Sequence, residues 1–352
     1  MLTRRSEYDI MNPTEMPRPT GFGHREKKRK RETMYRIGID LGGTNIAAGL
    51  VDENFVICAK ASTPTMAERE PSLIVDDIAM LCHRLVEQAG ITPDAVVSVG
   101  IASPGICNHD TGVVEYANNL PFRAFPICAL LRERFPVRAV YIENDANAAA
   151  WGEAIAGAAK GTRNSVMITL GTGVGGGIII DGKIYSGFNY AGAELGHVVI
   201  QKDGAPCSCG RRGCWEAYSS ATALIRMTEE KLEECRHDGR ETLMAEDVRA
   251  RGKVSGKTAF DAMRKGDAAA EEVINVYLDY LACGLASIIN IFQPEVLSIG
   301  GGISNEGDSL IALLEPRVRK EQYGGGLVPL THIRIAMLKN DAGIIGAAVL
   351  GM

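Results

Sequence analysis

The chain carries the same strand–glycine–strand pattern twice, and this repeat restricts its fold more than any other feature. IDLGGTNIAAGLVD (39–52) aligns with ITLGTGVGGGIIID (168–181) without a gap. Each copy reads as an apolar strand, a Leu-Gly turn and a second apolar strand that ends in Asp. The two copies start 129 residues apart, at 39 and at 168, which is the size of a domain. We therefore predict two similar α/β halves, each beginning with a glycine hairpin.

Strand and helix patterns alternate along the rest of the chain. Apolar residues at helical spacing between Ser72 and Gln88, followed by Gly90, predict a helix with a glycine stop. A long helix over 271–292 and a final helix over 341–351 are also expected. Three further buried strands are predicted, at 95–105, 137–145 and 295–302.

These patterns divide the 352 residues into two domains and an extension. Residues 1–33 show no apolar period and contain three prolines, so we predict a disordered N-terminal extension. The small α/β domain is expected over 34–144 and the large one over 145–340. The final helix, 341–352, is expected to pack back on the small domain.

Bulk composition excludes several classes of protein. The net charge of −5 gives the whole chain no attraction to nucleic acid or anionic lipid. We expect no apolar run long enough to span a membrane and see no signal peptide, which predicts a cytoplasmic protein. A basic run lies between Arg25 and Arg31. It fits a nucleic-acid arm or a solvated tail, and we favour the tail.

The glycine turns point to phosphate binding. Glycine hairpins expose backbone N–H groups without a Cβ to block a ligand. Asp40, directly before the first turn, is a candidate Mg²⁺ ligand. A pair of tight hairpins without a ligand is the alternative, but two turns plus the glycines of 300–302 favour a nucleotide. The predicted nucleotide-binding residues are Asp40, Gly42, Gly43, Thr44, Asn45, Gly171, Thr172, Gly173, Gly301 and Gly302.

Two common nucleotide motifs are excluded. Gly171, Gly173 and Gly176 fit G-x-G-x-x-G, but that dinucleotide motif needs a helix next. Here a strand, IIID (178–181), follows, so we reject a dehydrogenase. Neither turn contains G-x-x-x-x-G-K-[ST], which excludes a P-loop enzyme.

Three of the nine cysteines crowd into eight residues. His197, Cys207, Cys209 and Cys214 are spaced H-x9-C-x-C-x4-C, and three sulfurs with one imidazole make a closed tetrahedral Zn²⁺ site. We therefore predict a structural zinc loop over 197–214. The alternative is three unrelated thiols and a core histidine.

Asp145 lies where a strand is predicted to end and an alanine-rich helix to begin. Such junctions are where ligands bind in α/β sheets, although Asn and Asp there also serve as ordinary helix caps. A helix N-terminus keeps a carboxylate ionised. In phosphoryl transfer, Asp145 would orient an attacking hydroxyl and accept its proton late.

Together these pieces resemble the ROK family (repressors, open reading frames, kinases), and within it the bacterial glucokinases. The resemblance runs from Met34 to Met352. Its motifs are DLGGTN (40–45), ENDANAA (143–149), LGTGVGGG (170–177), AELGH (193–197), CSCGRRGCWEA (207–217) and SIGGG (298–302). It implies a two-domain actin-like ATPase (ribonuclease-H-like) fold with an inserted zinc loop and an active site in the cleft.

The resemblance also implies the chemistry. The expected reaction is phosphorylation of glucose to glucose 6-phosphate by ATP with Mg²⁺, with Asp145 as the catalytic base. His197 would hold zinc through one ring nitrogen and the sugar through the other. A homodimer or homotetramer is implied as well. The implied sugar-binding residues are Asn144, Asp145, Glu194, His197, Glu216, Gly105 and Asn119.

Two departures from the family pattern leave alternatives open. NNL (118–120) stands where family members often have PNL, which blurs which asparagine contacts the sugar. The repressors of the family carry an N-terminal helix-turn-helix domain, whereas only 33 residues precede this fold and show no helical period. We therefore disfavour a sugar-responsive repressor. A kinase for N-acetylmannosamine, N-acetylglucosamine or another hexose stays open.

Overall fold

The computed structural model describes residues 34–352, so the predicted extension over 1–33 lies outside the described residues. The first sheet has five strands in the order β3-β2-β1-β4-β8. Strands β1, β2 and β3 are antiparallel, whereas β1, β4 and β8 run parallel. The strands are β1 (Tyr35–Leu41), β2 (Asn45–Val51), β3 (Ile57–Pro64), β4 (Val96–Ser103) and β8 (Val140–Asn144).

The second sheet repeats this topology. Its order is β11-β10-β9-β12-β13, again with three antiparallel strands followed by two parallel additions. Its strands are β9 (Ser165–Leu170), β10 (Val174–Ile180), β11 (Lys183–Ile184), β12 (Val296–Gly300) and β13 (His332–Ile335). When 129, the offset of the sequence repeat, is added to the residue numbers of the first sheet, β1 ends where β9 ends. With the same shift, β2 begins and ends where β10 begins and ends. This duplication confirms the prediction of two similar α/β halves.

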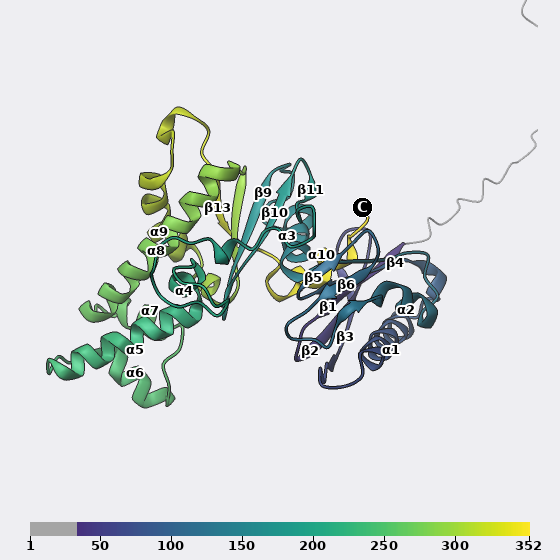
Figure 1. Cartoon of the computed structure of the whole chain (residues 1–352), viewed down its shortest axis with the longest axis horizontal. Helices are drawn as coiled ribbons and strands as arrows, with labels where there is room; N and C mark the ends of the chain where they lie inside the picture. Colours follow the sequence, from purple (N-terminus) through teal and green to yellow (C-terminus); the bar gives the residue numbers. More distant parts are fainter. Residues whose placement is uncertain (1–33) are drawn as a thin grey trace, which may run out of the picture. The chain divides into compact units, whose positions relative to one another are not determined.

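Two helices cover one face of the first sheet (Figure 1). The predicted helix at 72–88 is confirmed as α1 (Pro71–Ala89), and it ends at Gly90 in the left-handed conformation, with φ of 64°. It packs beside α2 (Ile127–Arg134), and the apolar side chains of β1 and β4 fill the core beneath them. A small three-stranded sheet belongs to the same half of the chain. Its strands are β5 (Ile106–Asn108), β6 (Val113–Tyr116) and β7 (Arg123–Phe125).

The opposite face of the first sheet contacts α10 (Ala342–Ala348). The approach is so close that a Cβ on Gly38 or Gly100 would overlap backbone atoms of α10. α10 also crosses α3 (Asp145–Ala156), where a Cβ on Gly152 would lie 2.8 Å from the Ala342 carbonyl oxygen. Glycines therefore let the last helix of the chain lie directly against the strand and the helix that carry the predicted carboxylates.

The remaining helices belong to the second half of the described chain, where the longest of them packs against most of the others. They are α4 (Glu216–Ser219), α5 (Ala221–His237), α6 (Leu243–Arg251), α7 (Thr258–Met263), α8 (Ala268–Phe292) and α9 (Asp308–Glu321). The long helix predicted at 271–292 begins three residues earlier, because the Asp267 side chain caps it by accepting from the Ala270 N–H at 2.8 Å.

Helix α8 qualifies the expectation that no segment is long and apolar enough to span a membrane. By length and composition alone, Ala268–Phe292 passes that test. However, 56% of its most apolar window is buried inside the protein, where Tyr277, Leu281 and Leu285 belong to the core of the second half. A core helix of a soluble protein has this character.

Candidate active site

Asp40 is the last residue but one of β1, and strand alternation decides which way its carboxylate points. The odd-numbered residues of β1 pack into the core under α1, so Asp40 faces α10 on the other side. A Cβ on Gly343 of α10 would lie 2.9 Å from the Asp40 carboxyl carbon. Burial, and secondly the charge of Asp145, raise the pKa of Asp40 from 3.8 to about 6.

Asn144 and Asp145 divide two roles that the sequence left open. Asn144 is the cap of α3, because its Oδ1 accepts the N–H groups of Ala146 at 2.9 Å and Asn147 at 3.2 Å. Asp145, the first residue of the helix, is therefore not needed as the cap, and its Oδ1 accepts from the Ala146 N–H at 2.8 Å. Its carboxylate is left to face the cavity.

The pKa of Asp145 reflects two opposing effects. A helix N-terminus favours the ionised carboxylate, and the Ala146 N–H does lower the pKa. Desolvation by the surrounding protein is the larger effect, although the side chain is open to the cavity, and it raises the pKa above the ordinary 3.8. Asp145 is thus a stronger base than the helix position alone predicts.

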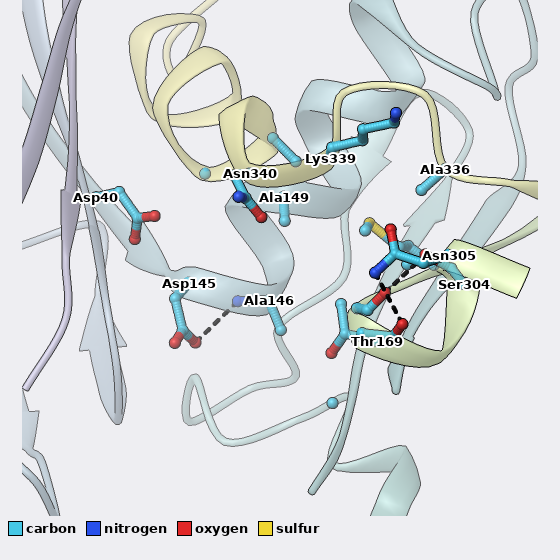
Figure 2. Close-up of a pocket in the computed structure, with 17 residues that line it drawn as sticks. Asp40, Asp145, Ala146, Ala149, Thr169, Ser304, Asn305, Ala336, Lys339 and Asn340 are labelled. Carbon is cyan, nitrogen blue, oxygen red and sulfur yellow. Dashed lines mark hydrogen bonds between the residues drawn. The ribbon is translucent and has the colours of Figure 1, made fainter. Parts of the chain in front are cut away.

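Both carboxylates line one cavity of about 420 Å³ (Figure 2). Strand ends of the second sheet and the segment before α10 form its other walls. The glycine exit from β12 is bent at Gly301, with φ of 82°, where a Cβ would lie 2.5 Å from the Leu170 carbonyl oxygen. Besides the carboxylates, the polar or glycine lining residues are Thr169, Gly175, Gly300, Gly301, Gly302, Ser304, Asn305, Lys339, Asn340 and Gly343.

The first glycine turn, Gly42 to Asn45, is a tight hairpin closed by the Gly42 N–H donating to the Asn45 carbonyl at 2.9 Å. A Cβ on Gly43 would lie 3.0 Å from the Cβ of Asn119, so this turn packs against the NNL segment. Within that segment, Asn118 accepts from the Tyr116 hydroxyl at 2.6 Å, whereas Asn119 forms no side-chain hydrogen bond with another described residue. Asn119 is therefore the asparagine of the pair whose side-chain oxygen and nitrogen are both unpaired among the described residues.

The second glycine turn, Gly171 to Val174, is held by Glu216 of α4. Glu216 Oε2 accepts from the Val174 N–H at 3.0 Å, and its Oε1 accepts from the Ser208 hydroxyl at 3.0 Å. One carboxylate thereby joins the turn to the cysteine loop. Thr172 and Gly173 line a second cavity of about 420 Å³ beside that loop.

The four predicted zinc ligands converge. One ligand atom from each of His197, Cys207, Cys209 and Cys214 lies within 4.8 Å of the others. Cys209 and Cys214 have sulfurs 3.6 Å apart, and the Cys207 sulfur lies 3.7 Å from His197 Nδ1. Zn–S bonds of 2.3 Å at tetrahedral angles place two sulfurs about 3.8 Å apart. The donor set and its spacing therefore fit a tetrahedral zinc ion.

The protonation of the thiols differs across the cluster. Hydrogen bonds from Arg211, first from its backbone and then from its side chain, lower the pKa of Cys209 to about 6. Burial raises the pKa of Cys214 to about 12. Because the thiolate is the metal ligand, Cys209 is a readier donor than Cys214 at neutral pH.

Glu194 and Gly105 depend on unusual backbone conformations. Ala193 has φ of 66°, a conformation that L residues rarely adopt, and it precedes the exposed Glu194 at the start of the short 3₁₀ helix Leu195–His197. Gly105 has φ of 98°, and a Cβ there would overlap the Tyr116 carbonyl. The Gly105 carbonyl accepts from the Asn144 amide at 3.1 Å, so this glycine positions Asn144.

Comparison with known proteins decides the family. The ROK family model matches residues 36–352. The chain belongs to the ROK family. It is 39% identical to a glucokinase of Streptomyces coelicolor over 317 residues, which cover 89% of this chain and 96% of that protein. It is 29% identical to the xylose repressor of Bacillus spizizenii, over 82% of this chain and 70% of the repressor.

A solved structure supports the same assignment. The ROK family glucokinase from Streptomyces griseus, in complex with glucose and AMPPNP, has a TM-score of 0.73 and 34% identity. The match covers 90% of this chain and 98% of that one. The predicted actin-like two-domain fold is thereby confirmed.

The structure of this ROK chain brings together only part of the predicted nucleotide set. Asp40, Gly301 and Gly302 line the carboxylate cavity with Asp145. The turn at Gly42 to Asn45 is not part of that lining, and Thr172 and Gly173 line the second cavity instead. Phosphate binding by the two turns from opposite sides stays a prediction.

Sequence reasoning missed a pair beside Asn144, formed by the buried Glu143 and the exposed His109. Glu143 is 3% exposed, and its Oε1 accepts the Asn144 N–H at 2.9 Å. Its other oxygen lies 3.1 Å from Nδ1 of His109, and this hydrogen bond raises the pKa of His109. The position of Glu143 next to Asn144 was a usable signal, whereas His109 lies 34 residues away and had none.

Proposed function

We propose that this ROK chain is an ATP-dependent hexose kinase that converts glucose to glucose 6-phosphate, with Asp145 as the base. The observation that carries the proposal is one cavity that contains Asp145, Asp40 and the glycine exit from β12. Family membership and the similarity to glucokinases support the sugar substrate. Kinases for N-acetylmannosamine or N-acetylglucosamine share these site residues and remain the alternative.

The proposed mechanism uses Asp145 to hold the sugar hydroxyl. The hydroxyl oxygen attacks the γ-phosphorus, the bond from that phosphorus to the β-phosphate bridging oxygen breaks, and ADP leaves. Asp145 accepts the hydroxyl proton as the new P–O bond forms. Its raised pKa favours this transfer, since the base is better matched to neutral pH. Asn144, by capping α3, keeps Asp145 in the first helical turn.

Asp40 is the residue that would hold Mg²⁺, directly or through water. Its carboxylate borders the cavity, and burial with a like charge nearby disfavours its ionised form, which a cation would relieve. When bound, Mg²⁺ supplies charge neutralisation for the phosphates.

The sugar is proposed to contact Asn119, Asn144, Glu194, His197 and Glu216, with Gly105 as support. Zinc on Nδ1 of His197 would fix the ring, so that Nε2 presents an N–H to a sugar hydroxyl. The two carboxylate oxygens of Glu216 already accept hydrogen bonds from the second turn and from Ser208. A sugar hydroxyl that contacts Glu216 would therefore share one of these oxygens. The zinc loop is thus proposed to organise the sugar side of the site.

Domain boundaries, location and assembly are proposed from the same family membership. We propose a small domain over 34–144, a large domain over 145–340, and α10 as a C-terminal addition to the small domain. The proposed location is the cytoplasm, and the proposed assembly is a homodimer or homotetramer. The net charge of −5 argues against nucleic acid or a membrane as partner.

Substitution of Asp145 tests the proposal. Asp145→Asn should lower kcat by about 10²- to 10⁴-fold, because the base is lost while the side-chain shape is kept. Sugar affinity, measured by calorimetry, should change little. The matched control is Asp94→Asn, because Asp94 is an exposed aspartate in the 3₁₀ helix Pro93–Ala95 and is distant from Asp145 in the sequence. Turnover of Asp145→Asn near that of the control would refute the base assignment.

A coupled ADP-release assay over hexoses and amino sugars identifies the substrate. Glucose should give the highest kcat/KM. A preference for an N-acetylated hexosamine would retain the kinase mechanism and correct the sugar. No ADP release with any sugar, together with a shift of promoter DNA in an electrophoretic assay, would favour a repressor.

A further inference from the structure

Lys339 has a backbone conformation that its residue type disfavours. It begins the 3₁₀ helix Lys339–Asp341 between β13 and α10, with φ of 52°. A long side chain is rarely found there, because the Cβ crowds the backbone. Such strained residues cluster at ligand sites and persist only where the surroundings hold them.

The surroundings do hold this segment on both sides. The buried carboxylate of Glu153 accepts the N–H of Met337 at 3.1 Å and of Leu338 at 2.7 Å. On the other side, Asp341 forms an ion pair with Lys60 of β3. Because both flanks are tied to other elements, the chain enters and leaves Lys339 in fixed positions, and the unfavourable φ is kept.

The ammonium group of Lys339 is without a partner. Among residues 34–352, no carboxylate forms an ion pair with Lys339 and its Nζ donates no hydrogen bond to a protein atom. It is the one cationic side chain among the residues that line the carboxylate cavity in the described chain. Figure 2 shows it across the cavity from Asp40 and Asp145, with Nζ directed away from both carboxylates.

A nucleotide triphosphate entering this cavity meets two carboxylates and one ammonium. We infer that Lys339 binds the α- and β-phosphates of ATP, and this inference rests on the kinase function proposed above. The γ-phosphate must lie near Asp145, where the hydroxyl attacks it. Lys339 lies on the other side, so it reaches the phosphates that stay with ADP. The glycine exit at Gly301 and Gly302 adds backbone N–H groups along the same wall.

This position predicts a particular kinetic effect. A contact to the α-phosphate is the same in the ground state and in the transition state, so its loss raises KM for ATP. A contact to the β-phosphate also stabilises the charge that develops on the leaving ADP, so its loss lowers kcat as well. Affinity for ADP should fall with it. Affinity for adenosine, which has no phosphate, should not change.

Three substitutions separate the charge from the backbone. Lys339→Ala removes the ammonium and keeps the strain, Lys339→Gly removes both, and Lys339→Arg keeps the charge. The exposed Lys183→Ala on β11 is the control for loss of one positive charge. KM values come from the coupled assay, and dissociation constants for ADP and adenosine come from calorimetry on the full chain.

The expected result is a rise of about tenfold in KM for ATP and in Kd for ADP in both the Ala and the Gly variants, which corresponds to about 1.4 kcal/mol. KM for glucose should stay unchanged, Arg should retain wild-type affinity within about threefold, and added salt should shrink the difference. The Gly variant should melt at a higher temperature than the Ala variant, because the strain is relieved.

Two results would overturn the inference. One is ADP affinity in Lys339→Ala equal to that of the Lys183→Ala control. The other is a loss in Lys339→Ala that Lys339→Gly restores, since that would assign the effect to the backbone. Failure of the proposed function would give a different result, because the wild type would then release no ADP with any sugar. In that case, a dependence of ADP affinity on Lys339 would still support the phosphate contact.

Discussion

Replacement of Gly173 by Ala tests the bond between the second glycine turn and the zinc loop. A Cβ at this position would lie less than 3.0 Å from Glu216 Oε2, closer than real Cβ atoms are found, so the carboxylate must move away. The backbone itself permits Ala, because Gly173 is not among the residues with positive φ. The whole cost therefore falls on Glu216.

The magnitude follows from the bonds that Glu216 makes. Its retreat breaks or lengthens the 3.0 Å bond from the Val174 N–H. A hydrogen bond to a charged group contributes about 1.5–3 kcal/mol, and the gain from a stiffer unfolded chain offsets about 0.4–1 kcal/mol of that. We expect the free energy of unfolding to fall by about 1–2 kcal/mol. The melting temperature should drop by about 2–4 °C.

A double-mutant cycle with Glu216→Ala identifies the cause. In the Glu216→Ala background the obstacle is gone, so Gly173→Ala should cost nearly nothing, and the coupling energy should be about 1–2 kcal/mol. Urea unfolding or thermal melts measure each corner. Gly171→Ala is the matched control, since a Cβ there meets nothing within 4 Å. Additivity within about 0.5 kcal/mol would refute the reasoning.

Two further predictions concern the metal and the buried carboxylate. Metal analysis should find about one Zn²⁺ per chain. Cys209→Ser should raise KM for glucose, because His197 loses its fixed orientation, and this rise should appear even in well-folded variant protein. Zinc-free, fully active protein would contradict the zinc site. Without Mg²⁺, stability should fall as pH rises from about 4 through about 6, because the folded state binds the Asp40 proton more tightly than the unfolded state does. Asp40→Asn should remove that slope and melt higher than wild type at pH 8 while losing turnover; a wild-type slope in the variant would contradict the assignment.

Local features were predictable from the sequence because their causes are local. The hairpins at 39–52 and 168–181 need only alternating apolar residues and a glycine turn, and both form where expected. The zinc cluster needs three thiols within eight residues, and Cys207, Cys209 and Cys214 do converge with His197. The alanine-rich helix also forms, although it begins at Asp145, which was predicted as the last residue of the strand over 137–145.

The role of each residue within the site depended on which distant segments come together. Lys339 and Gly343 belong to the cavity of Asp40 only because glycines let α10 pack against β1, about three hundred residues earlier in the chain. Glu216, implied as a sugar ligand, also accepts from the Val174 N–H of the second turn, and its contact with the sugar stays a prediction.

The sequence by itself determined the family, the duplicated strand order and the place of Asp145 at a strand-to-helix junction, because those follow from short-range patterns of residue type. Tertiary structure alone decided the direction in which the pKa of Asp145 departs from its ordinary value. Desolvation by surrounding elements outweighs the helix N-terminus and raises the pKa of Asp145, and the same burial brings the pKa of Asp40 to about 6. No run of neighbouring residues encodes how much water the fold removes from a carboxylate.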